Sequence, residues 1–253
     1  MSYKDIILKK IDNKICYLSL NRPQVLNALN INTFNELDNA IDKINKDTSI
    51  NVIIITGKGD RAFSSGADIN EMLTFNTKSD SEKLDKLRQQ FYLKLMKCNK
   101  PTIGMINGIA YGGGAILASC LDIRIGSENA KFQFSASKHG KLHGTWSLPL
   151  QIGWPLSKEL LFSAREIKSK EAYRIGLLNH LVSNRNLKNK SIELANQISN
   201  NYPEIVQKMK KIMIENIGYQ LTQMSNNEIN LRKQLDYVPI EKGFKTFINK
   251  KNN

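Results

Sequence analysis

Two glycine-containing turns hold the residues whose types and spacing are best suited to chemistry. The first is FSSGADINEM at residues 63–72, and the second is INGIAYGGGA at residues 106–115. Each turn follows a stretch typical of a strand and leads into a stretch typical of a helix. The first N–H groups of a helix have no partner within the helix, and the helix dipole favours negative charge there. Both turns therefore offer backbone donors that could stabilise an oxyanion.

Each turn alone is a weak signal, because a glycine before a helix is most often an ordinary turn. If the two turns converge, their N–H groups make a two-donor oxyanion hole, but the sequence does not show that they do. Neither turn continues into Gly-Lys-Ser/Thr or contains G-x-G-x-x-G, which argues against a P-loop and a dinucleotide site. Asp68 and Glu71 have the spacing of a capping box, which predicts that a helix begins at Asp68.

The elements that position these turns alternate between short strands and helices in the first half of the chain. Apolar and β-branched runs predict strands, and apolar residues at helical spacing predict helices. The expected strands are 6–11, 14–20, 52–56, 102–106, 122–127 and 131–135, and the expected helices are 33–46 and 80–97. From about residue 157 the pattern is helical almost throughout. We therefore expect an α/β core over residues 1–195 and a C-terminal helical region over residues 196–253.

The composition restricts the class of protein. The 253 residues are 41% hydrophobic, and no apolar run approaches the length of a membrane span. The N-terminus lacks a signal-peptide core, so a cytoplasmic location is expected. Three scattered cysteines predict neither a disulfide framework nor a metal site. The formal net charge of +14 suits a polyanionic partner: nucleic acid, an acidic membrane or a phosphate-bearing small molecule.

The pair FSSGADINEM and NGIAYGGGAILAS, about forty residues apart, resembles the signature of the crotonase superfamily, typified by enoyl-CoA hydratase and isomerase. Three other stretches agree in order: LNRPQVLNAL (20–29), NKPTIGMINGIAYGGG (99–114) and EIKSKEAYRIGLLNHLV (166–182). The resemblance covers residues from about 5 to 251. It implies a crotonase-like α/β spiral of ββα units, with a C-terminal helical region that helps to build homotrimers, commonly paired into hexamers.

The resemblance also implies an acyl-CoA substrate, with coenzyme A as part of that substrate and no separately bound cofactor. The thioester oxygen would sit between the N–H groups of Ala67 and Gly113. CoA contacts would fall on Gln24, Val25 and Leu26, on Ala67, Asp68, Ile69 and Asn70, and on the tail lysine Lys250. A strongly anionic CoA would explain the positive net charge. Asp68 itself is best interpreted as a helix cap.

The chain departs from the family pattern where hydratases carry their two catalytic glutamates. The matching positions are Ile116 and Ala136. Addition of water needs a base within hydrogen-bond reach, and neither side chain offers one. The segment SASKHGKLHGTWSLPLQIG (135–153) contains two of the three histidines, His139 and His143. His143 is a candidate acid or base, whereas His139 is expected to be a surface or packing residue.

Three hypotheses follow. The first is an acyl-CoA enzyme that stabilises a thioester enolate and isomerises, decarboxylates, hydrolyses or cleaves a C–C bond, with His143 moving the proton. The second is an enoyl-CoA hydratase whose acid and base come from other residues. The third is a catalytically silent homologue that binds CoA or RNA. The absence of basic motifs interleaved with aromatic residues argues against RNA.

Overall fold

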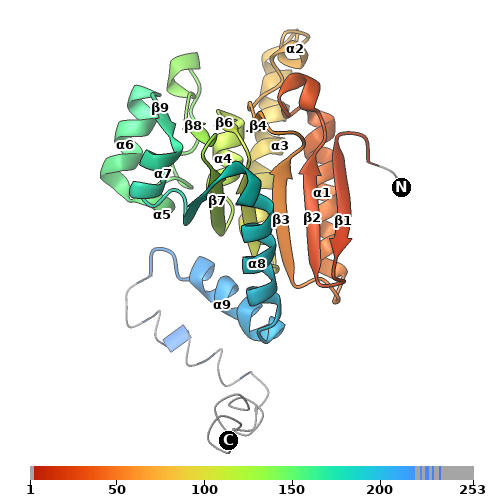
Figure 1. Ribbon diagram of the computed structural model, residues 1–253. Coiled ribbons are helices and arrows are strands. Elements are labelled where there is room, and N and C mark those ends of the chain that lie inside the picture. Colours follow the sequence, from red (N-terminus) through yellow and green to blue (C-terminus); the bar gives the residue numbers. More distant parts are fainter. Residues whose placement is uncertain (1–2, 220–222, 224–225, 228–229, 231–233, 235–253) are drawn as a thin grey trace, which may run out of the picture. The chain divides into compact units, whose positions relative to one another are not determined.

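The computed structural model describes residues 3–219 together with 223, 226, 227, 230 and 234 (Figure 1). The chain divides into two compact units, Met1–Gln207 and Lys208–Asn253. The sequence placed the division after residue 195, a position inside the helix α8 (Leu187–Ser199). The role of residues 196–253 in trimer formation stays a prediction.

The first sheet carries the longer strands. In spatial order these are β1 (Ile6–Ile11), β2 (Ile15–Leu20), β3 (Val52–Gly57), β5 (Thr102–Ile106), β7 (Ile123–Ser127) and β10 (His180–Val182). β1 and β2 form an antiparallel hairpin, and the other neighbours are parallel. Asp12 and Asn13, in the hairpin turn, have φ of +50° and +57°. Asp and Asn tolerate this left-handed conformation, so the turn that the sequence predicted here forms as expected.

The second sheet is built from strands of three residues each. Their order is β4 (Ala62–Ser64), β6 (Ile109–Tyr111), β8 (Lys131–Gln133) and β9 (Glu166–Lys168). β4, β6 and β8 run parallel, and each follows one strand of the first sheet along the chain. The chain therefore repeats a unit of long strand, short strand and helix, which is the spiral implied by the family resemblance.

Asn107 holds two successive units together at the corner between the sheets. Its Nδ2 donates to the carbonyls of Gly57 at 2.9 Å and Ala62 at 3.2 Å, and its Oδ1 accepts from Thr56 Oγ1 at 3.2 Å. A buried amide satisfied on both sides fixes the paths of both chain segments. The turns that leave β4 and β6 are thereby held in register.

The described chain also contains helices. They are α1 (Ile31–Lys46), α2 (Ile69–Met72), α3 (Lys78–Met96), α4 (Gly113–Ser119), α5 (Pro149–Ile152), α6 (Trp154–Ser163), α7 (Ser169–Arg174), α8 and α9 (Pro203–Glu215), with 3-10 turns η1 (Pro23–Val25), η2 (Ser137–His139) and η3 (Asn184–Asn186). Among the described residues, no helix combines the length and apolar character needed to cross a bilayer.

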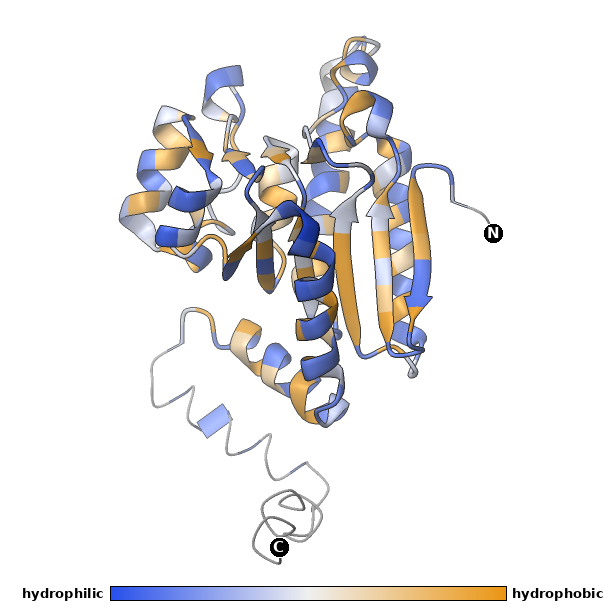
Figure 2. Cartoon of the chain, viewed as in Figure 1, coloured by the Kyte–Doolittle hydropathy of each residue, from blue (hydrophilic) through white to orange (hydrophobic). Residues whose placement is uncertain are grey.

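Strand β3 lies at the centre of the core and is buried at every position. Val52 and Ile54 pack with Leu187 and Ala195 of α8 on one face of the first sheet. Figure 2 shows β3 as hydrophobic along most of its length, with a pale C-terminal end, whereas the edge strand β1 includes hydrophilic residues. A strand covered on both faces loses the alternating pattern, which explains the unbroken run VIIIT in the sequence.

The structure differs from the sequence-based expectation mainly in its short elements. The region after residue 157 contains two strands, β9 and β10, in addition to helices. β4 and β6 were not expected either, because three residues cannot display a periodic pattern. Helix α1 begins two residues early, since the Asn30 side chain accepts from Thr33 N at 2.7 Å and caps it.

Candidate active site

The two glycine turns meet at one edge of the second sheet. β4 and β6 are neighbouring parallel strands, so the turns that follow them leave the sheet on the same side. A Cβ atom on Gly66 would lie 2.9 Å from Gly113 N, and one on Gly113 would lie 3.7 Å from Ala67 N. Gly66 also has φ of +94°, which side-chain-bearing residues rarely adopt. The convergence that the sequence left open is therefore a property of the fold.

Neither the Ala67 N–H nor the Gly113 N–H is used in the pairing of its own element. On either side of Ala67, the Gly66 carbonyl accepts from Leu29 N at 2.7 Å and Asp68 N donates to the Leu29 carbonyl at 3.1 Å. Because successive groups in extended chain face opposite ways, the Ala67 N–H points away from Leu29. Gly113 is the first residue of α4, so its N–H has no partner within the helix.

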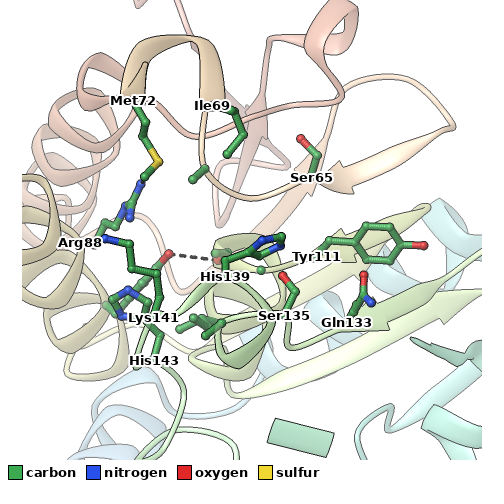
Figure 3. Close-up of a pocket in the computed structure, with 16 residues that line it drawn as sticks. Ser65, Ile69, Met72, Arg88, Tyr111, Gln133, Ser135, His139, Lys141 and His143 are labelled. Atoms are coloured by element: carbon green, nitrogen blue, oxygen red, sulfur yellow. Dashed lines mark hydrogen bonds between the residues drawn. The ribbon is translucent and has the colours of Figure 1, made fainter. Parts of the chain in front are cut away.

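Both donors open into a pocket of about 430 Å³ (Figure 3). Its walls come from α2, α3, the start of α4 and the chain after β8. The lining residues are Ser65, Ala67, Ile69, Met72, Arg88, Tyr92, Tyr111, Gly112, Gly113, Ile116, Gln133, Ser135, Ala136, His139, Lys141 and His143. A second cavity of about 490 Å³ shares four of these residues: Arg88, Tyr92, Ile116 and His143. The size of the first pocket suits a small acyl group.

Ile116 and Ala136, the positions that the family resemblance matches to the hydratase glutamates, both line this pocket. Ile116 is 6% exposed, on the second turn of α4, and Ala136 follows β8. Among the described residues that line the pocket, none is an aspartate or a glutamate. The walls therefore lack a carboxylate base, as the sequence suggested.

The two histidines of the 135–153 segment both reach the pocket. His143, the candidate acid or base, is half-buried, with Nε2 3.7 Å from Asp85 Oδ1 on α3. His139 lies at the end of η2, and Figure 3 shows its ring projecting into the pocket. His139 is thus a wall residue of the pocket as well as an exposed one, which its surroundings in the sequence did not indicate.

The surroundings of His143 favour its neutral form. Burial lowers the pKa of His143 below the ordinary value for histidine, Asp85 partly offsets this, and the positive charges of Arg88 and Lys141 lower it further. A neutral imidazole can accept a proton at neutral pH. His143 is therefore suited to act as a base before it acts as an acid.

Two functional candidates on α3 were not identified from the sequence. Tyr92 Oη donates to the Gly113 carbonyl at 3.0 Å, directly beside the donor turn. Arg88 is buried at 9% exposure and lines both cavities. The signal for Arg88 was present, because it lies four residues after Leu84 and three before Phe91, on the apolar face of the helix. A charged residue in an apolar stripe is unusual enough to mark a site.

Asp68 has a structural role in the fold. It caps α2, with its side chain accepting from Glu71 N at 3.3 Å, and its Oδ2 lies 2.7 Å from Arg22 Nη2. The reciprocal half of the predicted capping box does not form. The Glu71 carboxylate instead accepts from Ile31 N at 3.0 Å, which fixes the start of α1 against α2.

The residues expected to contact CoA lie around the first turn. Ser65 N donates to the Leu26 carbonyl at 2.9 Å, which places the 24–26 segment beside Ala67. Gln24 is exposed, and Val25 and Leu26 are half-buried. Ile69 is exposed and lines the pocket, while Asn70 is exposed next to it. Lys250 lies outside the described residues.

Comparison with known proteins identifies the family of this chain. The family model described as enoyl-CoA hydratase/isomerase matches residues 10–253. A short-chain-enoyl-CoA hydratase of Clostridium acetobutylicum is 38% identical over 83% of this chain and 81% of its own length. A crotonyl-CoA hydratase of Syntrophomonas wolfei is also 38% identical, over 72% of this chain and 70% of its own.

The fold agrees as well. The crystal structure of an enoyl-CoA hydratase from Bacillus anthracis superposes with a TM-score of 0.93 at 29% identity, covering 98% of this chain and 97% of the other. Fold, motif order and sequence identity lead to one conclusion: this chain is a member of the enoyl-CoA hydratase/isomerase family, within the crotonase superfamily.

Proposed function

We propose that the protein binds an acyl-CoA thioester with its carbonyl oxygen between the N–H groups of Ala67 and Gly113, and that it transforms this thioester through an enolate or, for hydrolysis, a tetrahedral oxyanion. The observation that carries the proposal is the meeting of the two glycine turns at a pocket without carboxylates. Enolate formation moves negative charge onto the carbonyl oxygen. Two fixed donors stabilise that charge, and one such donor contributes about 2.7–4 kcal/mol in comparable sites.

Proton transfer is assigned to His143. It faces the pocket, its lowered pKa keeps it neutral near pH 7, and Asp85 can stabilise the imidazolium once it forms. Reactions that need a single proton donor or acceptor fit this arrangement: double-bond isomerisation, decarboxylation, thioester hydrolysis or C–C cleavage.

The CoA moiety is assigned to the surface beside the first turn. Gln24, Val25 and Leu26 adjoin Ser65, and Ile69 and Asn70 are exposed at the start of α2. Asp68 supports this segment by capping α2. Lys250 is retained as a CoA contact in this proposal, and coenzyme A enters only as part of the substrate.

Enoyl-CoA hydration by other residues is the second candidate, and the names of the two hydratase relatives favour it. In that case, His143 and His139 would activate the water in place of the two glutamates. Crotonyl-CoA hydration, followed by loss of ultraviolet absorbance, separates the candidates. A rate equal to buffer excludes hydration of short-chain substrates.

The test of the leading proposal is an assay of the purified protein against a panel of acyl-CoA thioesters, with Gly113→Pro and Gly113→Ala beside the wild type. Proline lacks the N–H but is tolerated at the first position of a helix, whereas alanine keeps the N–H. We expect Gly113→Pro to lower kcat at least a hundredfold and Gly113→Ala to lower it much less. Absence of turnover of every thioester, with undiminished binding by Gly113→Pro, would instead support a silent CoA-binding homologue.

RNA binding, the other form of a silent homologue, predicts a steep loss of affinity as salt increases. Filter binding at two salt concentrations tests it.

For the assembly we propose a homotrimer or a dimer of trimers. Light scattering of the eluting protein should give three or six times the 28.7 kDa of one chain.

A further inference from the structure

The described side chains that line the pocket carry positive charge and no negative charge, and the carboxylate in contact with Arg88 and His143 is that of Asp85, which lines the cavity that shares both residues. The described lining of the pocket includes Arg88, Lys141 and two histidines, and it includes no acidic side chain. Figure 3 shows Arg88, Lys141 and His143 on the same side, across from the turn of Ser65. An uncharged acyl chain would gain no electrostatic attraction from these positive side chains, whereas a negatively charged one would.

The burial of the Arg88 side chain is energetically unfavourable. Its side chain is 11% exposed and stands in the apolar face of α3, between Leu84 and Phe91. Removing a guanidinium from water is unfavourable unless acceptors replace the water. Nη1 donates to Asp85 Oδ1 at 3.2 Å, but Nη2 donates to Met72 Sδ at 3.8 Å. A thioether is a weak acceptor, so a stronger acceptor in the pocket would gain a charge-assisted bond from Nη2.

Arg88 is also placed at a defined position relative to the thioester donors. It precedes Tyr92 by four residues, about 6 Å along α3, and Tyr92 bonds to the Gly113 carbonyl. Its partner Met72 ends α2, the helix that begins just after Ala67. Ile116, which lines both cavities with Arg88, provides apolar wall in the same region. A short acyl chain held at Ala67 and Gly113 can therefore pass Ile116 and end near Arg88.

We infer that the acyl group of the substrate ends in a carboxylate, which binds to the guanidinium of Arg88. Lys141 contributes further positive potential at the mouth of the same pocket. This inference rests on the proposed function, because it assumes that the thioester lies at Ala67 and Gly113. It adds the substrate class: CoA thioesters of short dicarboxylic acids.

The test compares matched thioesters that differ only at the chain end. Dissociation constants of glutaryl-CoA and pentanoyl-CoA, and of succinyl-CoA and butyryl-CoA, are measured by calorimetry for wild type, Arg88→Met, Arg88→Lys and Arg185→Met. Arg185→Met removes the same charge from an exposed position outside the pocket lining. We expect the wild type and Arg185→Met to bind at least one carboxylate-ended thioester ten times more tightly than its uncharged match. Arg88→Met should lose that ratio, and Arg88→Lys should keep part of it.

The outcomes separate the inference from the proposed function. If no thioester binds, the proposed function fails. If all bind but the wild type shows no preference in either pair, the function stands and the carboxylate inference is wrong. If Arg88→Met keeps the full preference, Arg88 is not the partner. The wild-type ratio does not depend on the folding of any variant, and circular dichroism checks the folding of the Arg88 variants.

Discussion

Tyr92 Oη donates to the carbonyl of Gly113 at 3.0 Å, and this bond ties the long helix α3 to the first residue of α4. The Tyr92 ring packs edge-on against Phe34, with ring centroids 5.9 Å apart. Burial raises the pKa of Tyr92, so the hydroxyl stays protonated and remains a donor. The residue whose N–H is one proposed oxyanion donor is thus held, through its carbonyl, from a different element.

Tyr92→Phe should weaken the positioning of Gly113 and keep the aromatic packing. We expect the free energy of unfolding to fall by about 1 kcal/mol, the usual net contribution of one hydrogen bond. We expect kcat to fall about tenfold with little change in KM, because the donor acts on charge that develops in the transition state. Tyr173→Phe, at a tyrosine that is 52% exposed, is the matched control and should change neither. A rise in KM with unchanged kcat would contradict a positioning role.

Glutamates at residues 116 and 136, the positions that the family resemblance matches to the hydratase glutamates, should introduce hydratase activity. Ile116→Glu with Ala136→Glu places both groups on the pocket wall. A positioned general base typically contributes a factor of about 10²–10⁴, so hydration of crotonyl-CoA should rise at least tenfold above wild type. Ile116 is 6% exposed, so its replacement should also cost about 2 kcal/mol of stability.

The control for these variants is the double glutamine substitution at residues 116 and 136. Glutamine has the shape of glutamate without its basicity, so it should give the same loss of stability and no gain in hydration. Equal rates from the glutamate and glutamine variants would mean that the two positions do not face the reacting water.

The rate of the proposed reaction should depend on pH through His143. A base must be unprotonated, and the pKa of His143 lies below 6.5 because of burial and the nearby positive charges. We therefore expect kcat/KM to reach a plateau above pH 6.5 and to fall on the acidic side. His143→Gln should remove this acidic limb and lower the plateau, while His180→Gln, outside the pocket lining, should leave the profile unchanged. An acidic limb that survives in His143→Gln and disappears in His139→Gln would reassign the base.

His143 also links stability to pH. The unfolded histidine takes up its proton near pH 6.5, whereas the folded one does so at a lower pH. Its contribution to stability is therefore complete above pH 6.5 and is lost as the pH falls toward the folded pKa. Urea unfolding of wild type and His143→Gln at pH 5.5 and 7.5 measures this difference. The variant should be less sensitive to the change of pH than the wild type.

Arg124 should be the most sensitive charged residue outside the pocket. It is 2% exposed, and burial lowers its pKa to about 10. Its guanidinium donates to the carbonyls of Leu177 and Leu121, both at 2.6 Å, and to Gln151 Oε1 at 2.5 Å. Arg124→Met leaves these acceptors without partners, so unfolding in urea should show a loss of about 2–4 kcal/mol. Arg185→Met, at an exposed residue, should change stability by less than about 0.5 kcal/mol.

The sequence predicted those parts of the fold that have a local physical signature. The unbroken apolar run of β3 and the Asp12-Asn13 turn identified the central strand and the first hairpin, and the structure confirms both. β4 and β6 were missed because their pairing partners are distant in sequence and each strand has three residues. Two strands within the C-terminal half were missed for the same reason.

The candidate site likewise contains features that the sequence predicts and features that only the fold reveals. The glycines identified the donor turns, but only the pairing of β4 with β6 brings those turns together, and no local pattern encodes that. The helical spacing of α3 identifies its apolar residues only, so it did not predict that Tyr92 and Arg88 reach the site. The position of Arg88 within that stripe was visible in the sequence and would have identified it.

The two proposed donors belong to the main chain, and this affects how the protein can change over time. Substitution of a pocket side chain that does not hold the turns, as Tyr92 does, leaves both N–H groups in place as long as the glycines remain. Residues such as Ile116, Ala136 and Arg88 can therefore be replaced one at a time while the two proposed hydrogen bonds to the thioester oxygen are kept. A lineage built on this scaffold can exchange one reaction for another without passing through an ancestor that has lost its substrate.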